Sequence, residues 1–197
     1  MLFRSTDDPP EKKDTAWFLA TALNPYPDLR GSLLPRQIPA AQLSSSRLAG
    51  VKKVLLTHAG RLSDEAAAAL AKQVFQGAGL ICFLDSPGDD RNLLALEKAT
   101  GPGVLPLQLT RWRSVTNAAA GAQQTVKGDF KSRYLKLFRG AARQDLGLLE
   151  FYDYWQARAT GAGQVLLVYG DESPALAAAT HGLGTILLLN FSASELS

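Results

Sequence analysis

The chain has 197 residues, of which 46% are hydrophobic and 20% charged, and its formal net charge is +3. These values are ordinary for one globular core and exclude wholesale disorder. The single cysteine, Cys82, excludes an internal disulfide and a cysteine-rich zinc site. The basic surplus is spread along the chain without a run of like charges, so we expect no nucleic-acid partner.

The sequence has no apolar stretch near the roughly 20 residues that a membrane helix needs. Its polar beginning also lacks the apolar core of a signal peptide. Met1 is the only methionine, and the chain stops soon after an apolar strand, so we expect a domain excised from a longer protein. We predict a flexible lead-in over residues 1–13 and a single domain over residues 14–197.

The first elements are a helix and a loop. The pattern predicts a helix over 15–23, with Asp14 as its N-cap and Asn24-Pro25 as its stop. Residues 25–40 hold several prolines and are expected to form a loop with an extended piece at Ile38.

From residue 41 the pattern becomes regular, beginning with a short polar segment over 41–48. It predicts a strand over 51–57, a helix from Ser63 as its cap to about residue 75, an apolar strand over 80–84 and a helix over 91–99. An uninterrupted apolar run is typical of a strand that is covered on both faces. Strands alternating with helices indicate right-handed crossovers and a parallel sheet. We therefore predict an α/β fold with three layers, α/β/α.

The second half has a different character. Residues 101–130 are rich in Gly, Ala, Thr and Gln and are expected to be irregular, and alternating aromatics follow over 146–154. Short strands over 164–169, 175–180 and 185–191 have only glycine-containing turns between them, which indicates antiparallel hairpins. The parallel core is thus expected to carry an antiparallel C-terminal extension.

Two residues could act as nucleophiles at the central strand. Cys82 lies within the strand between Ile81 and Phe83, where we expect a buried, unreactive thiol. Ser86 lies at the strand exit, where the nucleophile of an α/β hydrolase stands, but Pro87 follows it and the flanking glycine of a nucleophile elbow is missing. We therefore interpret Ser86 mainly as a residue of an ordinary turn.

The two histidines are the candidate bases. His58 follows a strand at the edge where α/β sites gather, so a base or ligand role competes with that of a solvated loop residue. His181 adjoins Gly182 in a predicted hairpin and is interpreted as a turn residue. A relocated hydrolase would use Ser86, His58 and an aspartate such as Asp85.

The sequence gives little support for a metal site, a phosphate or cofactor site, or a nucleic-acid site. Asp85, Asp89 and Asp90 could hold a hard cation, but acidic residues at a helix start are more often caps, so we predict no metal site. The glycine turns at 101–103 and 161–163 do not join a strand to a helix, so we predict no phosphate cradle and no cofactor. Arg111-Trp112-Arg113 is too little for a nucleic-acid strip and favours a packed tryptophan or a partner-facing loop.

The order of several blocks resembles a known family, the class I glutamine-amidotransferase-like domain. More narrowly, it is similar to the version found in bacterial aerotolerance-regulator (Bat-type) membrane proteins that also carry a von Willebrand factor A-like domain. The matching blocks cover most of residues 15–192 and are Val54-Leu55-Leu56-Thr57, the segment 61–74, the segment 77–84, Leu105-Pro106, the segment 170–176, Gly182-Leu183-Gly184 and Leu188-Leu189-Asn190-Phe191-Ser192.

The resemblance implies a flavodoxin-like sheet and a parent protein in the cytoplasmic membrane, with this domain periplasmic or otherwise extracytoplasmic and the membrane reached only through flanking segments. It also shows a departure, because the family's Gly-x-Cys-x-Gly elbow and His-x-Glu have no counterpart here. Ser86 occupies the elbow region, and His181 is followed by Gly182-Leu183. A glutaminase needs a thiolate and a base.

We therefore expect a non-catalytic domain that acts in assembly, sensing or binding of a partner such as the neighbouring A-type domain. Two alternatives stay open. One is an active amidotransferase or hydrolase with relocated residues. The other is a small-ligand or nucleotide-binding module at the strand ends after Thr57 and Leu84.

Overall fold

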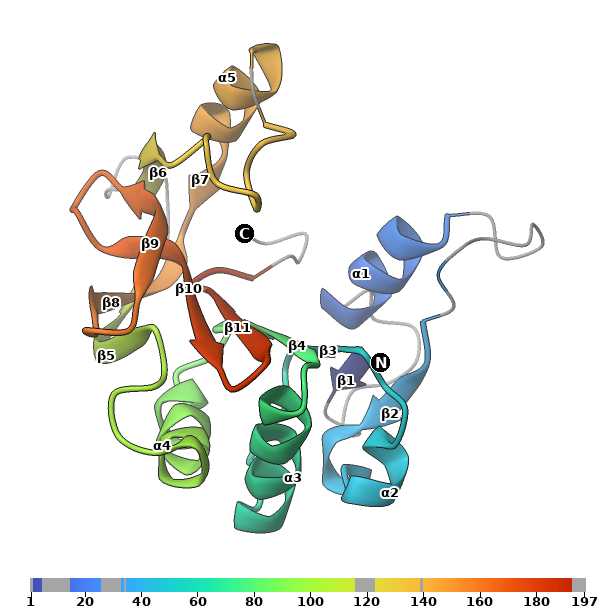
Figure 1. The fold of residues 1–197 in the computed structure, drawn as a ribbon. Coiled ribbons are helices and arrows are strands. Elements are labelled where there is room, and N and C mark those ends of the chain that lie inside the picture. The colour runs from blue at the N-terminus through green and yellow to red at the C-terminus, as the bar shows by residue number, and fades with distance from the viewer. Residues whose placement is uncertain are drawn as a thin grey trace.

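A computed structural model describes residues 2–4, 15–25, 33, 35–115, 123–138 and 140–192 of the chain. Figure 1 shows a mixed α/β fold. In chain order the elements are β1 (Leu2–Arg4), α1 (Thr15–Leu23), β2 (Gln37–Pro39), the 3₁₀ turn η1 (Ala40–Gln42), α2 (Ser45–Leu48), β3 (Lys53–Leu56), α3 (Asp64–Phe75), β4 (Gly79–Phe83), α4 (Asp89–Thr100), β5 (Leu107–Ser114), β6 (Gln123–Gly128), α5 (Ala141–Leu148), β7 (Glu150–Phe151), β8 (Asp153–Ala159), β9 (Gln164–Tyr169), β10 (Pro174–His181) and β11 (Gly184–Leu189).

Within the described residues, nine strands form one mixed sheet in the order β2-β1-β3-β4-β11-β10-β9-β6-β7, and β5 pairs with β8 in a separate ribbon. The strands from β2 to β11 are parallel to their neighbours. From β11 to β7 the pairing is antiparallel. The predicted α/β class, with a parallel part followed by an antiparallel one, is confirmed.

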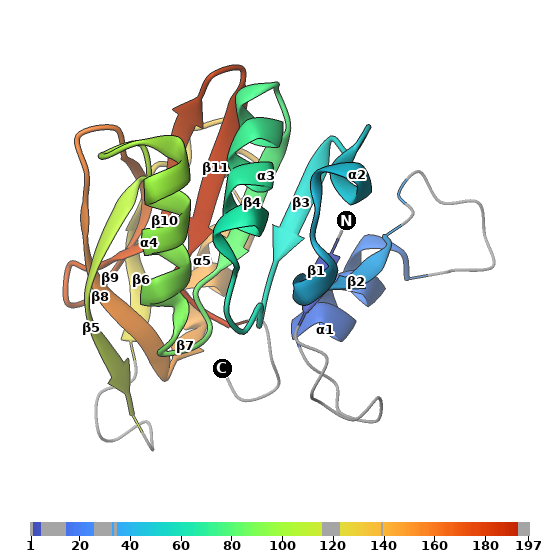
Figure 2. The ribbon, with the colours of Figure 1, turned by 90° about the horizontal axis from the view of Figure 1, so that it is seen from below.

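The main core lies between the parallel strands and the helices α3 and α4, which run side by side along one face of the sheet (Figure 2). Alternate residues of β3 and β4, such as Val54, Leu56, Leu80 and Cys82, point into this core and are at most 4% exposed. The face that α3 buries consists mainly of alanines, so its backbone packs close to the strands. Ser63 accepts a hydrogen bond from the backbone N–H of Ala66, as its predicted capping role requires.

A second core covers the antiparallel strands. Its centre is Tyr169, which is fully buried and stacks against Phe151 and Tyr154 with ring centroids 5.4 and 4.9 Å apart. These aromatics come from three strands and fix β7, β8 and β9 against one another. Of the aromatics expected around residues 146–154, Phe151 and Tyr154 are thus core residues, whereas Tyr152 is half-buried.

Several sequence-based expectations were wrong about the elements. Residues 2–4, expected in a flexible lead-in, form β1 between β2 and β3, while residues 5–13 and the expected N-cap Asp14 lie outside the described part. Residues 107–114 and 123–128, expected to be irregular, form β5 and β6. The helix α5 and the strand β8 were not predicted. By contrast, the helix over 15–23 and the extended piece at Ile38 are confirmed.

None of the helices in the described part of the chain is both long and apolar enough to cross a membrane.

Candidate functional site

The candidate site lies where β3 and β4 end. The two strands are parallel and in register, with Leu56 opposite Cys82. Thr57-His58 and Asp85-Ser86 therefore leave the sheet at the same edge, although 27 residues separate His58 from Asp85. Such carboxyl-terminal edges are where α/β proteins place their ligands and catalytic groups.

The carboxylate of Asp85 binds both the ring and the backbone N–H of His58. The side chain of Asp85 is 0% exposed, and its Oδ2 lies 2.8 Å from Nδ1 of His58. The same carboxylate accepts the hydroxyl of Thr57 at 3.1 Å and the backbone N–H of His58 at 3.3 Å. His58 has φ of +43°, an uncommon value for a residue with a side chain. The Asp85 contacts thus stabilise both the strained backbone and the orientation of the ring.

Ser86 belongs to a second network, centred on Asp89 at the start of α4. Oδ2 of Asp89 accepts the backbone N–H of Ser86 at 2.9 Å and the hydroxyl of Ser86 at 3.2 Å. Asn92 donates to Oδ1 of Asp89 at 3.2 Å and to the carbonyl of Gly60 at 2.8 Å, and accepts the N–H of Leu62. The hydroxyl of Ser86 therefore donates to the carboxylate of Asp89.

The environment of Asp89 favours a protonated carboxyl. Burial, with a smaller contribution from the negative charge of Asp85, raises the pKa of Asp89 to about 6, against its ordinary value of 3.8. Its hydrogen bonds with Ser86 and Asn92 act in the opposite direction and do not offset the burial. Asp89 is 5% exposed, which agrees with this cause.

Cys82 has the position expected from the sequence. It lies inside β4 and is 2% exposed. Burial raises the pKa of its thiol well above the ordinary value, and the nearby Asp89 raises it further. A neutral thiol enclosed by apolar side chains is a poor nucleophile.

The space between Cys82 and α4 is small. A cavity of about 10 Å³ is lined by side chains that include Thr57, Cys82, Asp89 and Asn92. That volume is at the limit of what a single water molecule needs. A substrate or nucleotide would have to bind above this edge, since the cavity inside it has no room for one.

The remaining candidates lie elsewhere. His181 ends β10 at the hairpin, where its ring contacts that of Phe75 edge to face at 5.3 Å. Trp112 packs on Trp155 across the β5–β8 ribbon, with centroids 5.5 Å apart, and Arg111 and Arg113 beside it are exposed. Asp90 is exposed and accepts the N–H of Arg91. In the described part of the chain, no group of three or more His, Cys, Asp or Glu side chains could hold a metal ion.

Sequence reasoning missed three residues that complete this edge: Asn92, Trp155 and Asn190. The indole N–H of Trp155 donates to the carbonyl of Ser86 at 3.1 Å. The amide of Asn190, which is fully buried, accepts the N–H of Trp155 and donates to the carbonyls of Trp155 and Pro174. An asparagine directly after an apolar strand, as in Leu188-Leu189-Asn190, was the available signal.

The arrangement as a whole is a satisfied polar network. Every polar group named above at the strand exits has a partner within the chain, and no buried side-chain polar atom of the described residues lacks one. Two features of this edge are suited to proton transfer: the pair of an enclosed Asp85 and a His58 whose side chain is 39% exposed, and Asp89 with its pKa of about 6.

Comparisons with known proteins reveal likeness in fold alone. No family model and no curated protein matches the chain. Among solved structures, the chain is similar to a cytoplasmic protein of Salmonella typhimurium, STM3548, with a TM-score of 0.66 and 14% identity over 98% of this chain and 88% of that one. It is also similar to the mmIFT52 N-terminal domain, with a TM-score of 0.64 and 17% identity over 98% and 88%. A putative ThuA-like protein from Bacteroides uniformis gives a TM-score of 0.64 at 9% identity over 98% and 81%.

Proposed function

We propose that this chain is a non-catalytic domain of the class I glutamine-amidotransferase-like kind, with a flavodoxin-like three-layer sheet. In this proposal it belongs to a membrane-anchored, multi-domain bacterial protein, stands outside the cytosol and acts by contact with a neighbouring von Willebrand factor A-like domain. The proposal is supported by the family-like blocks described above and by a strand exit that lacks the family's reactive residues.

The observation that carries the non-catalytic part is the hydrogen bonding of Ser86. Its hydroxyl and its N–H both bind Asp89, and its carbonyl accepts the indole of Trp155. The serine nucleophile of a catalytic triad has its hydroxyl directed at a histidine. Ser86 instead joins the β4 exit to the first turn of α4 and to β8, which is a structural role.

The proposed binding to an A-type domain can be tested once the open reading frame of the parent protein is known. Its A-type domain would be expressed separately and titrated with this chain by isothermal calorimetry. The proposal predicts saturable 1:1 binding. A parent without an A-type domain, or with one that releases no heat at concentrations of about 100 μM, contradicts it.

A relocated hydrolase is the second candidate, and the His58–Asp85 pair is the observation that favours it. An enclosed aspartate on Nδ1 is how triads orient a catalytic histidine. Hydrolysis of p-nitrophenyl acetate by the wild type, His58→Gln and Asp85→Asn decides between the two functions. A rate above the buffer blank that falls at least about 100-fold in both variants, the size of a general-base contribution, establishes the hydrolase.

The ligand-binding alternative at the ends of β3 and β4 has weaker support, because the polar groups at that edge are already paired with one another.

A further inference from the structure

The opposite end of the parallel strands carries a small apolar projection within a basic surface. The hairpin that joins β10 to β11 turns at Gly182 and Leu183, and Leu183 is 85% exposed. Beside it, Phe75 at the end of α3 is 58% exposed. The backbone N–H of Leu183 donates to the carbonyl of Phe75 at 3.0 Å, which joins the turn to the end of α3.

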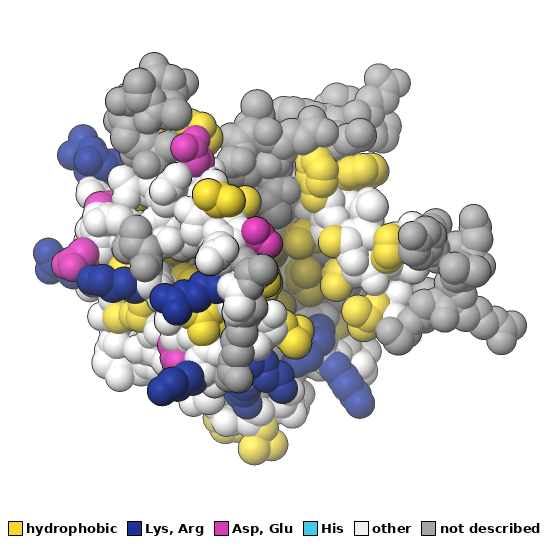
Figure 3. All heavy atoms as spheres, turned by 90° about the horizontal axis from the view of Figure 1, so that it is seen from above, with side chains coloured by type: hydrophobic (Ala, Val, Ile, Leu, Met, Phe, Trp, Pro, Cys, Tyr) yellow, Lys and Arg dark blue, Asp and Glu magenta, His cyan; other side chains and the backbone are white. Residues whose placement is uncertain are grey.

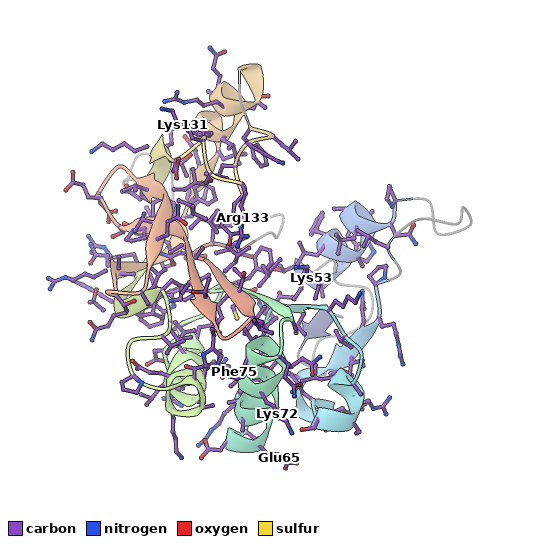
Figure 4. The ribbon with its side chains drawn as sticks, viewed as in Figure 1. Lys53, Glu65, Lys72, Phe75, Lys131 and Arg133 are labelled. Atoms are coloured by element: carbon purple, nitrogen blue, oxygen red, sulfur yellow. The ribbon has the colours of Figure 1, made fainter. Side chains whose placement is uncertain are left out.

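Cationic side chains surround this projection. Lys53 starts β3, and its side chain crosses Gly79 at the start of β4, which pairs in turn with Thr185 of β11. Arg133 reaches Thr185 from the other side, with Nη2 3.5 Å from its hydroxyl. Lys72 lies one helical turn before Phe75. Figure 4 shows Arg133 above the hairpin and Lys53 to its right, with Phe75 and Lys72 below.

A shallow hollow adjoins the same hairpin. Its volume is about 470 Å³, and among its lining residues are Ser132, Arg133, Gln164 and Thr180. Hydroxyl, amide and guanidinium groups of this kind donate hydrogen bonds to phosphate and carboxylate oxygens. Figure 3 shows Lys and Arg side chains gathered along the lower edge of that view, next to hydrophobic ones.

We propose that the projection formed by Phe75 and Leu183, together with Lys53, Lys72 and Arg133, is a docking surface for an anionic membrane surface, and that the hollow beside Arg133 receives a lipid headgroup. The charges complement acidic lipids, and an exposed leucine and phenylalanine insert at the interface while lysine side chains extend toward the headgroups. Two apolar side chains, one on the hairpin turn and one at the end of α3, cover much less than the roughly 800 Å² per partner of a stable protein interface. This surface is separate from the strand exits and does not depend on the function proposed above.

The test is co-sedimentation of the purified chain with vesicles of phosphatidylcholine alone and with 30% phosphatidylserine. Binding is expected only to the anionic vesicles, and it weakens when salt is raised from 0.1 to 0.5 M. Leu183→Ser should lower the partition coefficient about fivefold. The triple variant Lys53→Gln, Lys72→Gln, Arg133→Gln should lower it by about 100-fold, at about fivefold per cation.

Matched controls have the same chemistry on other faces. Leu94→Ser removes a leucine of α4 that is 67% exposed, and the triple variant Arg91→Gln, Arg111→Gln, Arg158→Gln removes three exposed cations. Both are expected to bind vesicles as the wild type does. No binding, equal binding to neutral vesicles, or equal loss in the control triple overturns the proposal. Self-association of the chain that Leu183→Ser abolishes, without any vesicle binding, would identify a second copy as the occupant and also overturns it.

Discussion

Asp89 is the residue whose environment has the clearest measurable consequence. Its pKa of about 6 in the folded protein lies above the ordinary value of 3.8, so folding favours the protonated carboxyl. Stability from this group is therefore fully present below pH 3.8 and is lost as the pH rises through 6. The difference between these pKa values corresponds to about 3 kcal/mol.

We predict that urea unfolding of the wild type and of Asp89→Asn shows this difference. From pH 3.5 to pH 7.5 the wild type should lose about 3 kcal/mol relative to the variant, because asparagine cannot ionise. A constant difference between the two proteins across that range would contradict the assignment of Asp89.

Cys82 gives a second prediction at the same scale. A thiol that is 2% exposed and has a raised pKa should not react with Ellman's reagent in the folded protein, and should react at once in 6 M guanidinium. Rapid reaction of the native protein, at a rate near that of a free thiol, would show that the β4 strand is open.

Some of these residue environments could be predicted from the sequence and others could not. Burial of Cys82 followed from its position inside an apolar run. The His58–Asp85 contact did not, although each residue follows a predicted strand, because the adjacency of the two strands is set by the sheet order. Asn190 and Trp155 join elements 35 residues apart, and nothing local in the sequence marks that pairing.

At the scale of elements, the contact between α3 and the β10–β11 hairpin depends on a glycine. A Cβ atom at Gly184 would lie 2.1 Å from the carbonyl oxygen of Val74 and 2.3 Å from that of Ala78. Both neighbours are backbone atoms, and they cannot move without displacing the end of α3 or the connection into β4. The strand must therefore approach the helix as closely as only glycine permits.

We predict that Gly184→Ala destabilises the protein by about 3 kcal/mol, at the upper end of the cost of overpacking. For a chain of this size, that lowers the melting temperature by about 6–12 °C. Gly161→Ala is the control, since a Cβ there meets nothing within 4 Å. Equal melting temperatures for the two variants would refute the close approach.

The elements that the sequence did not predict have identifiable physical reasons. In β5 the apolar residues Leu107 and Leu109 alternate with polar ones, but the next apolar residue, Trp112, is three positions further on. The reason is that the pairing with β8 shifts register between Leu109 and Arg111. An irregularity of this kind hides a strand from period-two reasoning. The strand β1 has only three residues and is stable through its neighbours β2 and β3 on either side.

At the scale of the whole molecule, Asn190 connects the main sheet to the β5–β8 ribbon. It is fully buried and bonds the backbone of Trp155 in both directions, as well as the carbonyl of Pro174. Its own carbonyl accepts the hydroxyl of Tyr169, so the two hydrophobic cores meet at this residue.

We predict that Asn190→Ala costs about 3–5 kcal/mol, because three backbone groups lose their partners inside the protein. Urea unfolding at pH 7 measures this cost, and Gln108→Ala on the exposed side of β5 serves as the control. A loss below about 1 kcal/mol would mean that water replaces the amide and that the ribbon is not fixed through Asn190.

In the proposed function, the polar groups at the ends of β3 and β4 support the fold and perform no chemistry. Asp85→Ala tests it most directly, because that carboxylate holds Thr57 and both the backbone and the ring of His58. We would measure, in the same preparations, the free energy of unfolding and the release of ammonia from glutamine and of p-nitrophenol from its acetate ester. We expect a loss of about 2–4 kcal/mol of stability, with both rates at the buffer blank before and after the change. A wild-type rate well above the blank that disappears in a variant as stable as the wild type would contradict it.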